Sequence, residues 1–176
     1  DPGPRLESLL VEEHFCDVSL RSLDGRTFKA HRLVLSMVSD PLFAMLRGGF
    51  AEGQQSEVPF EASSEALGAF LGCIYSGTAA VKTEVLPELL RLVHRWEVRD
   101  LQAPLTDLCL AQMTPELCSS LFLTCDVLLV GELGERLHWY ALKHFGGCAQ
   151  TEGFGSWPLH RVVGLVSSDD LVAQNE

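Results

Sequence analysis

The sequence predicts an α+β fold in which a small β-sheet is capped by helices and is followed by an all-helical extension. Two observations predict this division. Segments that alternate apolar and polar residues, as strands do, occur only before about Phe60. Apolar residues at helical spacing then continue to the end of the 176-residue chain. A chain of this length can bury one large core or two small ones.

The first predicted elements are a short helix and a β-hairpin. Residues 17–21 alternate as a half-buried strand does, and residues 26–30 alternate again. Between them, Asp24-Gly25 is a strong two-residue hairpin signal. The helix before them is predicted from apolar residues at helical spacing, which are Leu6, Leu9 and Leu10, followed by Phe15. An isolated helix this short is marginal in water, so its apolar face must dock on something.

Beyond His31 the apolar spacing becomes helical and predicts two short helices broken at Ser39-Asp40-Pro41. In this break we expect Asp40 to cap the second helix and Pro41 to take its first position. Residues 57–60 form a strand candidate, and Pro59 places that strand at a sheet edge.

The remaining elements are predicted to be helical. Ser63 can cap a helix that ends at Ser76-Gly77, and Thr114-Pro115-Glu116 marks a new helix start. Two more apolar stripes lie between them, through residues 86–96 and 101–108. The expected later elements are helices over 117–129 and 132–145, a loop from Gly146 to Trp157 with Gly146-Gly147 ending the helix before it, and one or two helices over 159–175.

Composition and charge argue against several partners. The formal charge is −11, from 13 basic and 24 acidic side chains, whereas nucleic acid requires a basic face. No apolar run approaches the roughly 18 residues that cross a bilayer. We therefore expect neither nucleic acid nor membrane as a partner. The chain also begins without Met or a secretory signal, so we expect a piece of a longer protein.

Six cysteines are spread along the chain, and no two have the two-residue gap of a zinc knuckle or a redox dithiol. They stand at positions 16, 73, 109, 118, 125 and 148. This distribution predicts reduced thiols in the cytosol or nucleus rather than a disulfide framework. The only sign of an activated thiol is His144, four residues before Cys148, so a role in redox sensing stays open.

No catalytic or metal-binding pattern is present in the sequence. It lacks Gly-x-Ser-x-Gly, a phosphate-binding glycine loop and His-Glu-x-x-His. The run Ser167-Ser168-Asp169-Asp170 is interpreted as a loop with a helix cap. His31 is predicted to be a core or helix-start histidine rather than a ligand. We expect no enzyme activity, no cofactor and no metal.

Several segments, taken in order, resemble the BTB/POZ family over residues 1–115. They are Phe15-Cys16-Asp17-Val18, Phe28-Lys29-Ala30-His31-Arg32, Val34-Leu35-Ser36, Phe43 and Tyr75-Ser76-Gly77. The family has an apolar-Cys-Asp-Val strand, then a Phe-x-Ala-His step into a helix pair, then a Tyr-Ser/Thr-Gly helix stop. Singly these signals are weak, but their order and spacing make the resemblance specific.

Residues 116–176 resemble an incomplete BACK extension of the BTB–BACK–Kelch proteins. Pro115-Glu116-Leu117-Cys118 is similar to the opening Pro-x-Asn-Cys of that extension, with Leu117 where Asn is usual. The run from Leu165 to Leu171 is similar to its Leu-Leu-Ser-Ser-Asp-x-Leu segment. The departure at Leu117 removes a polar side chain from that helix start.

The resemblance implies a homodimeric, non-catalytic substrate adaptor of a cullin-3 RING E3 ubiquitin ligase, with substrate recognised by a C-terminal domain such as a Kelch propeller. It implies that Phe50 and Glu52 bind cullin-3, where the alternatives are a core-anchoring aromatic and an ordinary surface acid. It also places Asp17 near the dimer interface. The equally weighted alternative is that Asp17 is a residue at the end of a strand whose side chain is bonded to the backbone. The helix residues Leu6, Leu9 and Leu10 are implied to cross to the partner subunit, the alternative being packing on their own domain.

Two other functions are compatible with a BTB domain. One is a transcriptional scaffold that binds co-repressor peptides along the dimer groove, and the other is a tetrameric channel-type domain. The BACK-like helices after Pro115 favour the ubiquitin-ligase adaptor over both.

Overall fold

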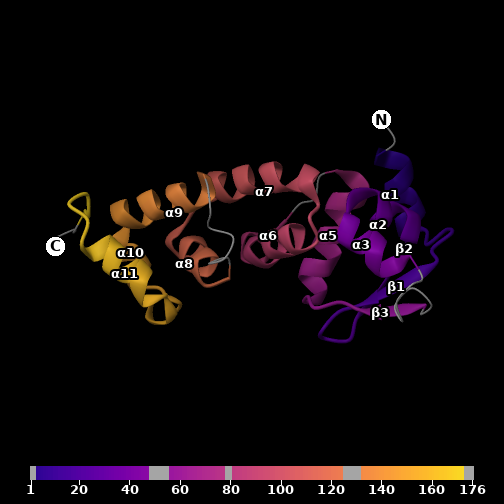
Figure 1. Cartoon of the computed structure of the whole chain (residues 1–176), viewed down its shortest axis with the longest axis horizontal. Helices are drawn as coiled ribbons and strands as arrows, with labels where there is room; N and C mark the ends of the chain where they lie inside the picture. Colours follow the sequence, from indigo (N-terminus) through magenta and orange to yellow (C-terminus); the bar gives the residue numbers. More distant parts are fainter. Residues whose placement is uncertain (1–2, 48–55, 78–80, 125–131, 173–176) are drawn as a thin grey trace. The chain divides into compact units, whose positions relative to one another are not determined.

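The computed structural model describes residues 3–47, 56–77, 81–124 and 132–172 (Figure 1). The chain divides into two compact units, residues 1–104 and 105–176, which we call unit 1 and unit 2. Each unit is described by itself. The domain boundary expected at residue 115 stays a prediction.

Unit 1 contains a three-stranded sheet with the order β2-β1-β3, so the predicted α+β fold is confirmed. Strands β1 (Val18–Arg21) and β2 (Thr27–Ala30) pair antiparallel, with Leu20 opposite Phe28. This confirms the predicted hairpin. Strand β3 (Glu57–Pro59) pairs parallel with β1, and Leu20 lies opposite Val58. Since β3 has one strand neighbour in the described sheet, Pro59 lies on an edge strand as expected.

One face of the sheet is buried and the other is open to solvent. Val18, Leu20 and Val58 are at most 3% exposed. On the other face, the guanidinium of Arg21 lies 2.9 Å from the carboxylate of Glu57. The alternation of apolar and polar residues in the sequence therefore predicts which face of the sheet packs against the core.

Helices of unit 1 lie on one side of the strands in the view of Figure 1. They are α1 (Gly3–Val11), α2 (Arg32–Val38), α3 (Asp40–Leu46), α5 (Ser64–Ser76), the short 3₁₀ turn η1 (Thr83–Val85) and α6 (Leu86–Arg95). Helix α5 contacts both α1 and α6. Its Gly68 passes close to β2, because a Cβ there would stand 3.3 Å from the Phe28 ring. Helix α7 (Arg99–Ala111) contains the division between the units.

The ends of these helices agree with the sequence signals, with one correction. Ser39, rather than Asp40, caps α3, because its hydroxyl accepts a hydrogen bond from the Leu42 amide at 3.0 Å. The two adjacent residues are both good capping types, and the extended backbone of Ser39 decides between them. Ser63 caps α5 as predicted, and Gly77 ends it at a φ of 74°.

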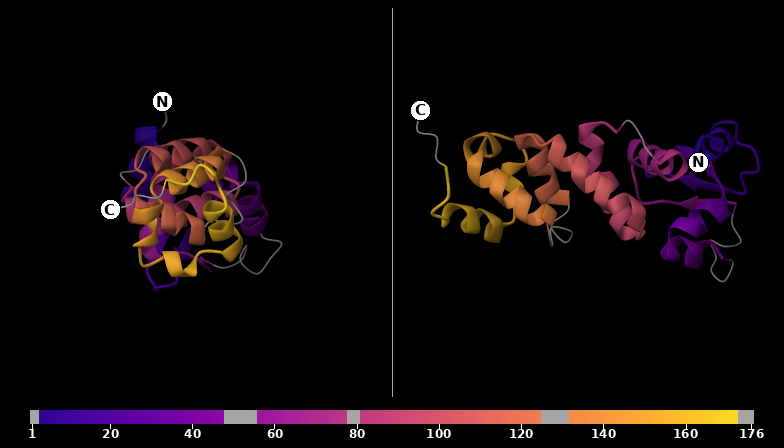
Figure 2. Two further views of the ribbon diagram at one scale, coloured as in Figure 1. Left: turned by 90° about the vertical axis from the view of Figure 1, so that its left-hand side faces the viewer. Right: turned by 90° about the horizontal axis from the view of Figure 1, so that it is seen from above.

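Every described element that lies wholly in unit 2 is helical, which Figure 2 shows from two further directions. These are α8 (Pro115–Thr124), α9 (Glu132–Lys143), α10 (Phe145–Ala149), the 3₁₀ turn η2 (Phe154–Ser156) and α11 (Leu159–Val166). An aromatic cluster forms part of the core, with the Trp157 ring 4.5 Å from that of Phe122 and 4.9 Å from that of Phe154. The Thr114 hydroxyl accepts from the Leu117 amide at 3.2 Å, which confirms the predicted start of α8.

The loop predicted from Gly146 to Trp157 is wrong in its first part. Gly146 and Gly147 lie inside α10, and the chain breaks at His144 instead. Gly147 serves close packing, because a Cβ at this position would stand 3.1 Å from the Pro115 ring of α8. A pair of glycines usually ends a helix, but this pair instead allows α10 to pack closely against α8.

Candidate interaction surface

Helix α1 packs on its own unit, but the packing is incomplete. Leu6, Leu9 and Leu10 are each half-buried, and α1 contacts α5. Leu10 and Val11 also line an open groove of about 360 Å³ together with Leu71 and Tyr75 of α5. The alternative in which α1 packs on its own domain is thus seen in the isolated chain. A contribution of these leucines to a dimer interface stays a prediction.

The turn that follows α1 has an unusual backbone. Glu13 and Phe15 have φ angles of 54° and 62°, in the left-handed region that non-glycine residues rarely adopt. The Phe15 side chain is 85% exposed. Such a turn persists only where neighbouring contacts hold it.

A buried histidine holds this turn. The His31 ring Nε2 lies 2.7 Å from the carbonyl oxygen of His14, and its Nδ1 lies 2.9 Å from the Tyr75 hydroxyl. The Tyr75 hydroxyl also accepts a hydrogen bond from the His31 amide at 2.8 Å. His31 is only 8% exposed. One side chain therefore joins the end of the α1 segment, the start of α2 and the body of α5.

The partners of His31 determine its tautomer. The His14 carbonyl can only accept, so Nε2 carries the proton and Nδ1 accepts from the Tyr75 hydroxyl. Burial raises the pKa of Tyr75 to about 12, so this hydroxyl keeps its proton at neutral pH. Every polar atom of the imidazole has a partner, which agrees with the predicted core histidine.

Asp17 takes the backbone-bonded role that the sequence left open. Its carboxylate accepts a hydrogen bond at 2.7 Å from the amide of Arg32, the first residue of α2. A carboxylate at a helix N-terminus accepts a hydrogen bond from an amide that has no partner within the helix. Its negative charge also interacts favourably with the helix dipole. The Asp17 side chain is exposed in this chain. Its place at a dimer interface stays a prediction.

Helix α2 carries an exposed apolar face that the sequence analysis missed. Leu33 and Met37 are 71% and 77% exposed, whereas Leu35 is fully buried. Leu33 and Met37 are four residues apart and so lie on one side of the helix. We call these two side chains the α2 face. The available signal was that Leu33 and Met37 are apolar although they lie on the side of the helix opposite Leu35, which predicts that this outer side is covered as well.

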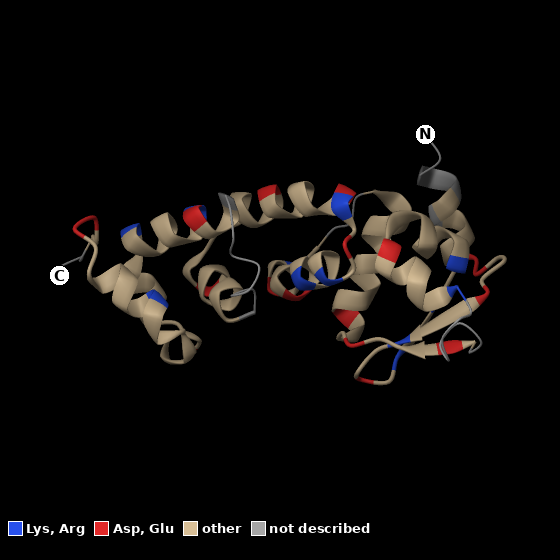
Figure 3. Cartoon of the chain, in the orientation of Figure 1, with Lys and Arg blue, Asp and Glu red and all other residues tan. Residues whose placement is uncertain are grey.

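Among the described residues, charged side chains of both signs are interspersed rather than gathered at one site. Figure 3 shows Asp and Glu on both units with Lys and Arg among them. Lys29 pairs with Glu13 at 2.8 Å beside the turn after α1, and both side chains are about half exposed. Exposed ion pairs of this kind contribute little to the stability of the fold. Within the described ranges, no group of three or more His, Cys, Asp and Glu could hold a metal ion.

Phe50 and Glu52, predicted to bind cullin-3, lie outside the described residues. Their role therefore stays a prediction. The described flanks are the end of α3 at Leu46 and the start of β3 at Glu57.

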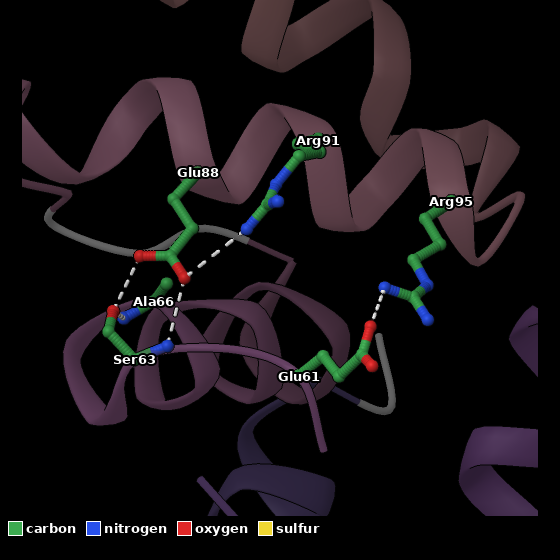
Figure 4. Close-up of polar contacts among 6 residues, drawn as sticks. All are labelled: Glu61, Ser63, Ala66, Glu88, Arg91 and Arg95. Atoms are coloured by element: carbon green, nitrogen blue, oxygen red, sulfur yellow. Dashed lines mark hydrogen bonds and ion pairs between the residues drawn. The ribbon is translucent and has the colours of Figure 1, made fainter. Parts of the chain in front are cut away.

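A polar cluster fastens α5 to α6, as Figure 4 shows. The Glu88 carboxylate accepts from the Ser63 amide at 2.9 Å and from its hydroxyl at 2.6 Å. The same hydroxyl accepts from the Ala66 amide at 3.2 Å and so caps α5. Arg91 lies 3.7 Å from the Glu88 carboxylate. Glu88 therefore orients the cap of one helix from its position on the next.

Replacing Glu88 with Ala is expected to lower the free energy of unfolding of unit 1 by about 1–2 kcal/mol, as is Ser63→Ala. The double variant should lose less than the sum, because both changes remove the hydrogen bond from the Ser63 hydroxyl to the Glu88 carboxylate. Hydrogen exchange of α5 and α6 peptides measures each loss. Glu61→Ala is the control, because Glu61 pairs with Arg95 at an exposed site. An equal loss in this control contradicts the assignment.

The comparisons with known proteins agree with these features. The BTB/POZ domain family matches residues 6–112. Human Kelch-like protein 4 is 28% identical over 98% of this chain and 24% of its own length. Bovine Kelch-like protein 3 is 26% identical over 97% of this chain and 29% of its own. The solved BTB domain of zebrafish PATZ1 has a TM-score of 0.51 and 23% identity, over 59% of this chain and 84% of that domain.

The similarity to the Kelch-like proteins extends through both units. The chain spans about a quarter of the length of the curated relatives it matches. None of the helices in the described ranges is both long and apolar enough to cross a membrane. The family match covers more than half of the chain, and the Kelch-like relatives align with the rest as well. The chain belongs to the BTB/POZ domain family and resembles the BTB–BACK part of the Kelch-like proteins.

Proposed function

We propose that this chain is the BTB–BACK part of a non-catalytic substrate adaptor in a cullin-3 RING E3 ubiquitin ligase. It forms a homodimer through unit 1 and binds cullin-3, and substrate is recognised by a further C-terminal domain. The observation that carries the proposal is the similarity to Kelch-like proteins, which continues beyond residue 112 into the BACK-like helices.

The dimer is supported by apolar surface that unit 1 leaves open. The α2 face is more than 70% exposed, and Phe15 is 85% exposed. The His31–His14 hydrogen bond brings the turn that carries Phe15 to the start of α2. Exposed apolar side chains gathered on neighbouring segments are typical of protein interfaces. A second copy of unit 1 supplies the same apolar residues and can cover them symmetrically.

The cullin-3 contact is assigned to Phe50 and Glu52. An aromatic side chain on a loop can fill an apolar pocket of a partner. A carboxylate two residues away can pair with a partner amide or cation and set the register. Both residues lie between α3 and β3, in a segment that the sequence predicts to be polar apart from Phe50.

Calorimetric titration with the N-terminal domain of cullin-3 tests the function. The wild-type chain should bind, and Phe50→Ala/Glu52→Ala should lower the affinity at least about 30-fold, because interface anchors of this kind are worth about 2 kcal/mol or more. The control is Leu23→Ala/Glu57→Ala, which removes an exposed apolar and an exposed acidic side chain elsewhere on unit 1.

Sedimentation must show that the double variant keeps its oligomeric state. Undiminished affinity of Phe50→Ala/Glu52→Ala rejects the assignment of the site. Absence of binding by the wild-type chain rejects the cullin-3 adaptor itself.

A further inference from the structure

Two buried thiols from different helices meet inside unit 2. Cys118 of α8 and Cys148 of α10 are both fully buried, and their side chains are hydrogen-bonded to each other. The Cys118 sulfur also lies 3.9 Å from the carbonyl oxygen of Leu137. All five cysteines in the described ranges are free thiols. The proximity of this pair is a product of the fold, since the two residues stand far apart in the sequence.

Contacts on both sides keep the two helices in register at this pair. On one side, Gly147 lies against Pro115, so that a Cβ on the glycine would come within 3.1 Å of the proline ring. On the other side, the hydroxyls of Ser119 and Thr151 are 2.6 Å apart. The Thr151 hydroxyl also donates to the carbonyl of Cys148 at 2.7 Å. These flanking contacts hold the two helices, and therefore the two thiols, close to each other.

The two sulfurs are not equivalent. The hydrogen bond from Cys118 lowers the pKa of Cys148, although burial opposes this change. The same hydrogen bond and burial both raise the pKa of Cys118. By contrast, burial raises the pKa of Cys109 to about 11 with no thiol neighbour contributing. Cys148 is thus the sulfur of the pair that ionises first, and the thiolate is the reactive form.

Helix α10 offers a route for a small reagent to reach the buried pair. It has only five residues, and two of them are Gly146 and Gly147. Glycine inside a helix is less favourable than alanine, and so short a helix has few hydrogen bonds of its own. A local opening of α10 alone would expose Cys148 and would leave α8 and α9 folded.

We propose that Cys118 and Cys148 form a dithiol site that a peroxide converts into an intramolecular disulfide. The Cys148 thiolate attacks hydrogen peroxide, the O–O bond breaks, and Cys148 becomes a sulfenic acid while the released hydroxide takes up a proton to form water. The Cys118 sulfur then attacks the Cys148 sulfur, the S–O bond breaks, and a second water leaves. Two thiols and one peroxide yield one disulfide and two waters, with two electrons passing from sulfur to oxygen.

The test is mass spectrometry of the full chain after treatment with hydrogen peroxide and alkylation of the remaining thiols. Trypsin cutting at the Arg and Lys residues of this region releases residues 100–136 and 144–161. We expect these two peptides to be linked, with a loss of two hydrogens that a reductant reverses. Fragmentation must place the bond on Cys118, because the first peptide also contains Cys109 and Cys125. No link, or a link at another cysteine of this peptide, overturns the proposal.

Single variants test the order of the two steps. In Cys118→Ser, peroxide should leave a Cys148 sulfenic acid that dimedone traps, whereas Cys148→Ser should give no dimedone adduct at Cys118. Cys73→Ser/Cys109→Ser is the control and should keep the link. Phenylarsine oxide, which bridges two adjacent thiols, tests the untreated chain without any variant. It should bind one-to-one at this pair, and its failure to bind there contradicts the adjacency. None of these outcomes depends on cullin-3.

Discussion

Replacement of Tyr75 by Phe is expected to lower the free energy of unfolding of unit 1 by about 2–3 kcal/mol, because buried polar groups left without a partner cost about 1–3 kcal/mol each. The hydroxyl that is lost serves both the His31 amide and the His31 Nδ1. Tyr75 is 1% exposed, so water cannot take its place without a rearrangement. Hydrogen exchange of α5 and β2 peptides measures the loss for unit 1 alone.

Tyr140→Phe provides the matched control, because it removes the other tyrosine hydroxyl of the chain from a half-buried position in unit 2. It should leave the exchange of unit 1 unchanged. If Tyr75→Phe also leaves unit 1 unchanged, the hydrogen bonds between Tyr75 and His31 do not stabilise unit 1.

The same hydroxyl gives unit 1 a dependence on alkaline pH. The pKa of Tyr75 is raised from 10.0 to about 12 by burial, so between these values the unfolded chain loses the proton that the folded chain keeps. The contribution of Tyr75 to stability is therefore complete below pH 10 and is lost as the pH rises through about 12. Absorbance of the phenolate should show Tyr75 ionising late in the folded chain and near pH 10 after denaturation.

Charging the α2 face is expected to separate the dimer. In Leu33→Asp/Met37→Asp each protomer brings two carboxylates to the proposed interface, where the wild-type side chains are apolar. Burying unpaired like charges costs several kcal/mol, so the dimer dissociation constant should rise at least about 100-fold. Both side chains are more than 70% exposed in the isolated chain, so the fold should survive. Analytical ultracentrifugation measures the change.

Two further chains separate the possible outcomes of this experiment. Leu23→Asp charges another exposed leucine, 73% exposed next to the hairpin turn, and should leave the dimer intact. A chain that begins at Phe15 removes α1 and should also weaken the dimer if Leu6, Leu9 and Leu10 cross to the partner. A dimer of unchanged tightness in Leu33→Asp/Met37→Asp means that the α2 face is not the interface.

The fold was predictable where its signals are local. Asp24-Gly25 predicts the hairpin, and Ser63 and Gly77 predict the start and the end of α5. Each of these signals depends only on the backbone within a few residues of it. The cap of α3 was predicted to be Asp40 rather than Ser39 because these two adjacent residues are both good capping types. The error at Gly146-Gly147 had another origin, since packing against Pro115 outweighed the usual effect of glycine on a helix.

The candidate surface was predictable only in part, because its parts meet through long-range contacts. Asp17 and His31 stood out as single residues, yet the sequence does not say that one carboxylate meets the start of α2 or that one imidazole meets Tyr75. The exposure of Leu33 and Met37 depends on which side of α2 the core takes. The meeting of Cys118 and Cys148 requires α10, an element that the sequence analysis assigned to a loop.

In the proposed dimer, the hydrogen bond from His31 to His14 links assembly to folding in this corner of the protein. It fixes the unfavourable turn at Glu13 and Phe15, and that turn in turn sets where α1 lies. In a dimer formed through α1 and α2, association therefore stabilises the same backbone that the imidazole holds. We therefore expect mass action to make the measured stability of unit 1 rise with protein concentration. Melting curves of this chain are comparable only at one stated concentration.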